Sequence, residues 1–145
     1  MNLKELHDQW DKDNTIDRNN LASESANVPK LHNKYYLVYA EQSKVLNKLK
    51  RDYKKVVSIK SQYYRGELNN KEDLEKYGWE PQRKKVLKND VPSHLDNDED
   101  VMKIKEKLDE QEQMYLYLGE IISQINSRGW QIKNIIDWER WRSGG

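Results

Sequence analysis

The C-terminal third of the chain carries an apolar repeat that few folds can accommodate. From Val101 to Ile136, inward positions recur at alternating steps of three and four residues over five heptads. This spacing keeps one face of an α-helix apolar and is typical of a coiled coil or a bundle helix. The members are Val101, Ile104, Leu108, Gln111, Tyr115, Leu118, Ile122, Ile125, Gly129, Ile132 and Ile136. We predict a helix capped by Asp98 or Asp100, a bend or short break at 127–129, and a last helix over 130–141.

A second long helix is predicted from Pro29 to Arg65. After Pro29 this stretch contains no glycine or proline, and its apolar residues keep helical spacing. Gln42 and Lys60 occupy two of the expected inward positions, and Gly66 is a natural C-terminal stop. The apolar face of the 101–136 helix therefore has two possible partners. One is this helix, in an antiparallel hairpin, and the other is the same helix in a neighbouring subunit.

The remaining segments predict short helices and loops. Leu3, Leu6 and Trp10 indicate an amphipathic helix over 2–12, and Asp17 is a candidate N-cap for a second short helix ending near Ala26. Residues 67–98 look irregular, with one or two helical turns at 71–77. The fold class is thus all-α, a long helical hairpin with short N-terminal helices and a C-terminal helix.

Composition points to self-association and away from several other classes. Hydrophobic residues make up 35% of the 145 residues, so a single copy can build only a thin core. The chain has no cysteine, which excludes disulfides and thiolate metal sites. The start MNLKELHDQW lacks the apolar run of a signal peptide, and no apolar stretch is long enough to span a membrane. We expect a protein that acts in the cytoplasm, with no membrane partner.

One stretch concentrates positive charge. Residues 44–66 hold eight basic residues and one acid, whereas the whole chain has a net charge of +1. The simplest interpretation is a solvent-exposed helix face whose lysines aid solubility, but such faces usually interleave acids with lysines. Here the cations repel each other, and a polyanion would relieve that repulsion. The candidate DNA-binding residues are Lys48, Arg51, Lys54, Lys55, Lys60, Tyr64, Arg65, Lys84 and Lys85.

The tyrosines of this stretch add a second kind of contact. Phenol rings can stack on unpaired bases, so a single strand is the favoured ligand. Tyr63 keeps the inward phase of the helix, whereas Tyr64 does not, and Tyr64 is the better stacking candidate. The sequence therefore predicts short N-terminal helices over 1–28, a basic DNA-binding helix and loop over 29–98, and an oligomerisation region over 99–145.

The C-terminal region offers apolar and aromatic side chains for contacts between copies. Trp130, Trp138 and Trp141 place more aromatic surface in a short segment than one helix can bury. The candidate oligomerisation residues are Leu108, Tyr115, Leu118, Ile122, Ile125, Ile132, Ile136 and Trp138. No glycine-rich phosphate loop, nucleophile elbow or metal-ligand spacing is present in the sequence. We therefore expect neither enzymatic activity, nor a metal, nor a cofactor.

Three segments together resemble a known family. They are IDRNNLASESANVPKLHNKYY (16–36), KSQYYRG (60–66) and INSRGWQIKNIIDWERWRSGG (125–145). In order and separation they are similar to the T4-type phage recombination mediator family UvsY, in the form carried by related marine phages. The resemblance covers most of the chain and is weakest over 67–98.

The resemblance implies a protein without catalytic activity that binds single-stranded DNA in the cytoplasm of a bacterial host. It implies homo-oligomeric rings of about six or seven copies. It further implies that these rings help a RecA-like phage recombinase to replace the phage single-strand-binding protein. In the family a basic pair before the two tyrosines is associated with DNA binding. Here the second member of that pair matches Lys60, but the first falls on Ser58, so Lys54, Lys55 or Arg65 would have to compensate.

Another class of function fits the same residues. A structural coiled-coil oligomer with no nucleic-acid role would use the same heptads, and it predicts assembly without salt-sensitive binding to oligonucleotides. An amphipathic helix on an anionic membrane fits less well, because the apolar face carries tyrosines and short aliphatic residues.

Overall fold

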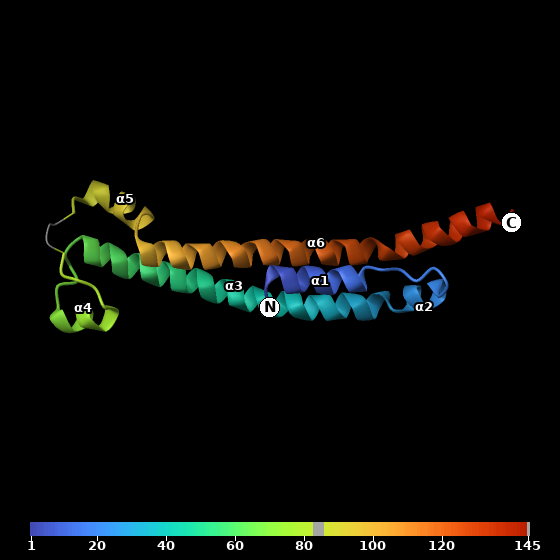
Figure 1. Ribbon diagram of the computed structural model, residues 1–145, viewed down its shortest axis with the longest axis horizontal. Helices are drawn as coiled ribbons and strands as arrows, with labels where there is room; N and C mark the ends of the chain where they lie inside the picture. Colours follow the sequence, from blue (N-terminus) through green and yellow to red (C-terminus); the bar gives the residue numbers. More distant parts are fainter. Residues whose placement is uncertain (83–85, 145) are drawn as a thin grey trace. The chain divides into compact units, whose positions relative to one another are not determined.

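The computed structural model describes residues 1–82 and 86–144, and the regular elements in those ranges are all helical. The helices are α1 (Leu3–Asp13), α2 (Leu21–Ala26), α3 (Val28–Tyr64), α4 (Lys71–Tyr77), a 3-10 turn η1 (Lys88–Asp90), α5 (Val91–Asp96) and α6 (Glu99–Arg142). The two long helices, α3 and α6, form the predicted hairpin (Figure 1). None of the helices in the described ranges is long and apolar enough to cross a membrane.

The chain packs as two units. The first contains Met1–Val45 and Glu110–Gly145, and the second contains Leu46–Asp109. Both long helices contribute to both units, so neither unit is one continuous segment of sequence.

In the first unit, α1 packs against α3 and α6 (Figure 1). A capping box starts α1: the Glu5 N–H donates to the Asn2 side chain at 2.8 Å, and the Asn2 N–H donates to Glu5 at 3.0 Å. Leu6 and Trp10 then fall on one face and are buried. The core residues of this unit are Leu6, Trp10, Tyr35, Met114, Leu118, Ile121 and Ile125. The predicted helix over 2–12 is confirmed.

The packing of α1 changes which residues of α6 are buried. Met114 and Ile121 are buried, whereas the predicted seam residues Tyr115 and Ile122 are half-buried. Tyr115 stacks on Tyr39, with ring centroids 4.6 Å apart, and their hydroxyls are hydrogen-bonded. Because α1 covers the neighbouring side of α6, the buried stripe is rotated away from the a/d pattern toward α1.

A buried arginine holds the segment between α1 and α2. The Arg128 guanidinium donates to the carbonyls of Asn14 at 3.2 Å and Thr15 at 3.1 Å, and it pairs with Glu24 at 3.0 Å. Its side chain is 4% exposed. Arg128 of α6 therefore fixes the position of α2 and of the loop before it.

The structure decides between two alternatives in this unit and corrects one cap. α6 continues through 127–129 as one helix, and Figure 1 shows it changing direction toward its C-terminal end, so the predicted bend is present, and neither a break nor a separate last helix is. A helical glycine costs only about 1 kcal/mol, and the hydrogen bonds of Arg128 favour continuity. The N-cap of α2 is Asn20, not Asp17. Asp17 instead accepts hydrogen bonds from the Asn19 N–H and the Asn20 side-chain amide.

In the second unit, α4, η1 and α5 connect the end of α3 to the start of α6. α3 ends at Tyr64, just before the predicted stop at Gly66, which has φ 76° and donates to the Tyr63 carbonyl at 3.1 Å. Asp98 directly precedes α6 and caps it: its carboxylate accepts from the N–H groups of Asp100 and Val101. The predicted cap by Asp98 is therefore confirmed.

Candidate nucleic-acid interface

The exposed side of α3 in the second unit is a row of cations. Lys48, Arg51 and Lys55 recur at steps of three and four, so they lie along one stripe of the helix. Lys50 and Lys54 flank this stripe, and all five side chains are exposed. We call these five residues the outer face of α3. The opposite side is apolar and half-buried or buried, with Leu46, Leu49, Tyr53 and Val56.

The cations of the outer face have no acidic partner among residues 1–82 and 86–144. Their repulsion is therefore not relieved by an ion pair within the described part of the chain. A row of exposed, unpaired cations along one helix is the arrangement that attracts a phosphate backbone and releases its counterions.

Lys60 belongs to the same basic stretch but has a different environment. Its ammonium lies 3.0 Å from Asp98 and 3.0 Å from Asp100, and its side chain is 7% exposed. It also lies 3.9 Å from the ring centroid of Trp79, a cation–π contact. The inward position of Lys60 in the helical pattern was the signal for this burial. Its three partners are distant in the sequence, and nothing in the pattern identified them.

Tyr64, the second candidate from this end of α3, is also bonded within the chain. Its hydroxyl donates to Asp98 at 2.5 Å. Burial, followed by the hydrogen bond and charge of Asp98, raises the pKa of the Tyr64 hydroxyl well above its usual value. Its ring lies 5.2 Å from the His94 ring, centroid to centroid. In the folded chain, Tyr64 therefore holds α3 against the start of α6.

The carboxylate between Lys60 and Tyr64 stays ionised. Burial alone would raise the pKa of Asp98, but hydrogen bonds from Tyr64, the Val101 N–H and Lys60, with the charge of Lys60, lower it overall. One acid thus caps α6, pairs with Lys60 and accepts from Tyr64. This ionic cluster fixes the end of α3 that follows the outer face.

The segment after α4 supplies the aromatic part of the cluster. Asn70 caps the N-terminus of α4, and Gly78, with φ 72°, ends the helix in the left-handed conformation. The Trp79 N–H then donates to the Leu74 carbonyl at 2.9 Å. This sharp reversal brings the Trp79 indole beside Lys60, and its N–H donates to Asp100 at 3.3 Å.

The other predicted DNA-binding residues fall in two groups. Arg65 is exposed and pairs with Glu67 at 3.3 Å, a surface contact that contributes little. Lys84 and Lys85 lie outside the described residues. Among the predicted DNA-binding residues in the described part of the chain, Lys48, Arg51, Lys54 and Lys55 therefore lie together on the outer face of α3, and Arg65 directly follows the end of this helix.

The predicted oligomerisation residues are also divided by the fold. Leu108, Leu118, Ile125 and Ile132 are buried within a single copy, and Tyr115 and Ile122 are half-buried. Ile136 and Trp138 are exposed, together with Trp130 and Trp141. The rings of Trp138 and Trp141 stack with centroids 5.0 Å apart. The exposed tryptophans of this region therefore lie toward the C-terminal end of α6, whereas Met102 and Leu116 are exposed nearer its start and middle.

Comparisons with known proteins agree with this architecture. A family profile described as "UvsY: Recombination, repair and ssDNA binding protein UvsY" matches residues 9–145. No curated protein sequence matches the chain.

Crystal structures of the recombination mediator protein UvsY of bacteriophage T4 have the same fold. One is 24% identical, with a TM-score of 0.83, and the match covers 99% of this chain and 98% of that chain. Another is 23% identical, with a TM-score of 0.85, and the match covers 97% of this chain and 99% of that chain. The family resemblance read from the sequence segments is therefore confirmed, and so is the all-α hairpin.

Proposed function

Because the chain belongs to the UvsY family of recombination, repair and ssDNA binding proteins, we propose that it binds single-stranded DNA through the outer face of α3. The observation that carries this proposal is the row of exposed cations without acidic partners in the described part of the chain. Lys48, Arg51, Lys54 and Lys55 bind phosphates, and Arg65 extends the row. Lys84 and Lys85 remain candidates for the same strand.

In this proposal Lys60 and Tyr64 support the interface from inside. Both are bonded to Asp98, and the cluster fixes the C-terminal end of α3 and hence the position of the outer face. Their role is to position the cations that reach the strand. A direct contact would require Lys60 to leave two carboxylates, which costs more than using an exposed lysine.

The biological role that follows is that of a recombination mediator without catalytic activity. A ring of about six or seven copies would present several outer faces to one strand, and linked weak sites bind far more tightly than one site. Such a ring would restrain a strand covered by the phage single-strand-binding protein. It would then favour its replacement by a RecA-like recombinase in the cytoplasm of the bacterial host.

The salt dependence of DNA binding tests this function. Changing Lys48, Arg51, Lys54 and Lys55 together to alanine is expected to weaken binding to an oligo(dT) strand. The slope of log affinity against log salt should fall by about 0.7 for each phosphate that is no longer bound, or about 2.8 in total. Fluorescence anisotropy over a salt series measures both quantities.

The control removes the same charge elsewhere. Lys4, Lys12, Arg18 and Lys30 are exposed and lie outside the outer face, and their combined change to alanine should leave most of the slope of log affinity against log salt in place. Wild-type protein that assembles but shows no salt-sensitive binding to oligonucleotides would instead support the structural coiled-coil oligomer. An outer-face variant with the wild-type slope would refute α3 as the interface.

We propose the C-terminal tryptophans as the contact between copies. Trp130, Trp138 and Trp141 share one side of α6, and they are 66%, 53% and 71% exposed. Such aromatic surface is typical of interfaces. Changing Trp138 and Trp141 to alanine should shift the mass measured by light scattering toward one copy. Helicity measured by circular dichroism should stay unchanged, because both side chains are exposed. A variant that keeps the wild-type mass would contradict this interface.

A further inference from the structure

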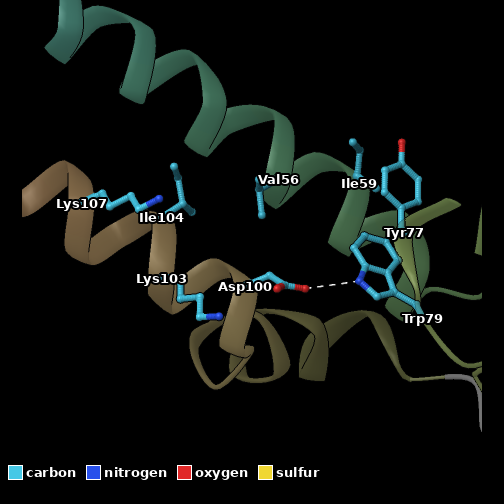
Figure 2. Close-up of a pocket in the computed structure, with 8 residues that line it drawn as sticks. All are labelled: Val56, Ile59, Tyr77, Trp79, Asp100, Lys103, Ile104 and Lys107. Atoms are coloured by element: carbon cyan, nitrogen blue, oxygen red, sulfur yellow. Dashed lines mark hydrogen bonds between the residues drawn. The ribbon is translucent and has the colours of Figure 1, made fainter.

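The second unit contains a pocket that the proposed phosphate contacts do not use. Its volume is about 360 Å³, and it is lined by Val56, Ile59, Tyr77, Trp79, Asp100, Lys103, Ile104 and Lys107. Figure 2 shows Tyr77 and Trp79 on one side, Ile104 with the two lysines on the other, and Val56 and Ile59 contributed by α3. The volume lies in the range of pockets that hold small organic groups.

The aromatic side of the pocket is held in place. The Tyr77 and Trp79 rings stack with centroids 4.7 Å apart and an interplanar angle of 21°. Trp79 is in turn fixed by Lys60 at 3.9 Å from its ring and by its hydrogen bond to Asp100. Tyr77 remains 38% exposed. The pocket therefore offers a preorganised flat wall, with one ring partly accessible from solvent.

The rim of the pocket carries positive charge that is available to a ligand. Lys103 and Lys107 are one helical turn apart on α6, both are exposed, and neither makes an ion pair among residues 1–82 and 86–144. The acid at the pocket, Asp100, is already paired with Lys60 at 3.0 Å. An apolar, aromatic pocket with free cations on its rim suits a flat group attached to a phosphate.

The pocket continues the outer face of α3. Ile59, which lines it, lies one helical turn beyond Lys55, so the two residues are neighbours on the helix surface. A strand that follows Lys48, Arg51 and Lys55 would therefore arrive at the pocket. From there, Lys103 and Lys107 would offer the next positive charges.

We infer that the pocket takes a nucleobase of the bound single strand. The base lies against Tyr77 and the aliphatic side chains of Val56, Ile59 and Ile104, and the adjoining phosphates pair with Lys103 and Lys107. This inference rests on the proposed function and adds a base-binding subsite to the phosphate contacts of α3. Every base has an apolar face, so binding here is tolerant of sequence.

An oligonucleotide without bases separates binding of the base in the pocket from binding of the phosphates by lysines. We would measure anisotropy with labelled oligo(dT) and with a strand of equal length made of abasic residues. Wild-type protein should bind oligo(dT) at least about fivefold more tightly than the abasic strand, which is the lower end of the stacking effect. Tyr77→Ala should bring this ratio toward one, with little change in the salt slope.

The salt dependence of DNA binding tests the role of Lys103 and Lys107. The double change Lys103→Ala and Lys107→Ala should lower the log–log salt slope by about 1.4. The matched control, Lys4→Ala with Lys30→Ala, removes the same charge from exposed positions in the first unit and should leave the slope near the wild-type value. Circular dichroism and urea titration establish whether each variant is folded. If Tyr77→Ala does not fold, Tyr77→Leu is used in its place.

The outcomes distinguish the subsite from the function. If wild-type protein binds neither strand, the proposed function itself is wrong. If it binds both strands with a steep slope, but Tyr77→Ala keeps the wild-type ratio and the lysine pair keeps the wild-type slope, only the base-binding subsite is wrong. The pocket then has another occupant, such as an acidic peptide of a partner protein.

Discussion

Replacing Lys60 by alanine is expected to lower the free energy of unfolding by about 3–5 kcal/mol. The change leaves Asp98, whose side chain is 5% exposed, without its cation, and it removes the contact with Trp79. An uncompensated buried charge costs more than the ion pair contributed, because it cannot be solvated. Urea denaturation followed by circular dichroism measures the effect.

The same helix provides the control for Lys60. Lys54 is exposed and unpaired within the described residues, so Lys54→Ala should change the stability by no more than about 0.5 kcal/mol. At a temperature where both variants are folded, Lys54→Ala should weaken DNA binding more than Lys60→Ala does. If Lys60→Ala has wild-type stability but does not bind DNA, Lys60 contacts the strand directly, as the family resemblance implies, and the buried ion pair is not its main role.

Leu118→Asp is expected to unfold the first unit. Leu118 is completely buried between α1, α3 and the rest of α6. Removing a buried leucine side chain costs about 2–5 kcal/mol, and an unpaired carboxylate at the same position adds its own desolvation cost. The sum approaches the whole stability of a domain of this size, about 5–15 kcal/mol. Loss of helicity and of a cooperative urea transition would show it.

Leu116 supplies a matched control two residues away. It lies on the same helix but is 67% exposed, so Leu116→Asp should leave the folded chain intact. If Leu118→Asp retained the wild-type helicity and urea midpoint, the three-helix core would be wrong. If Leu116→Asp kept its fold but had a smaller mass in solution, the contact between copies would extend along this face of α6.

Local patterns in the sequence were enough to predict the elements. The repeat from Val101 to Ile136, the long stretch after Pro29 and the stop at Gly66 each act within a few residues of the chain. The cap at Asp98 is equally local, and the short helix at 71–77 begins and ends where Asn70 and Gly78 place it. Helix periodicity and capping depend on neighbours three or four positions apart, so they can be read without knowing the fold.

The prediction was less complete where a residue's role depends on a distant partner. A basic stretch of eight cations was read as one DNA-binding surface, yet Lys60 faces Asp98, Asp100 and Trp79, whereas Lys54 and Lys55 face solvent. The pocket in the same unit combines residues from α3, from α6, from the last residue of α4 and from the segment after it. No spacing within one helix could have shown that these side chains meet.

The sequence by itself determined that this chain forms two long helices, one of which carries a concentrated positive charge, and it identified the family. The tertiary structure alone decided which cations are free, because burial depends on the helices that pack across from each position. It also decided that Met114 and Ile121 are buried whereas Tyr115 and Ile122 are only half-buried, since α1 covers that side of α6. Periodicity specifies which face of a helix is apolar, whereas only packing specifies what that face meets.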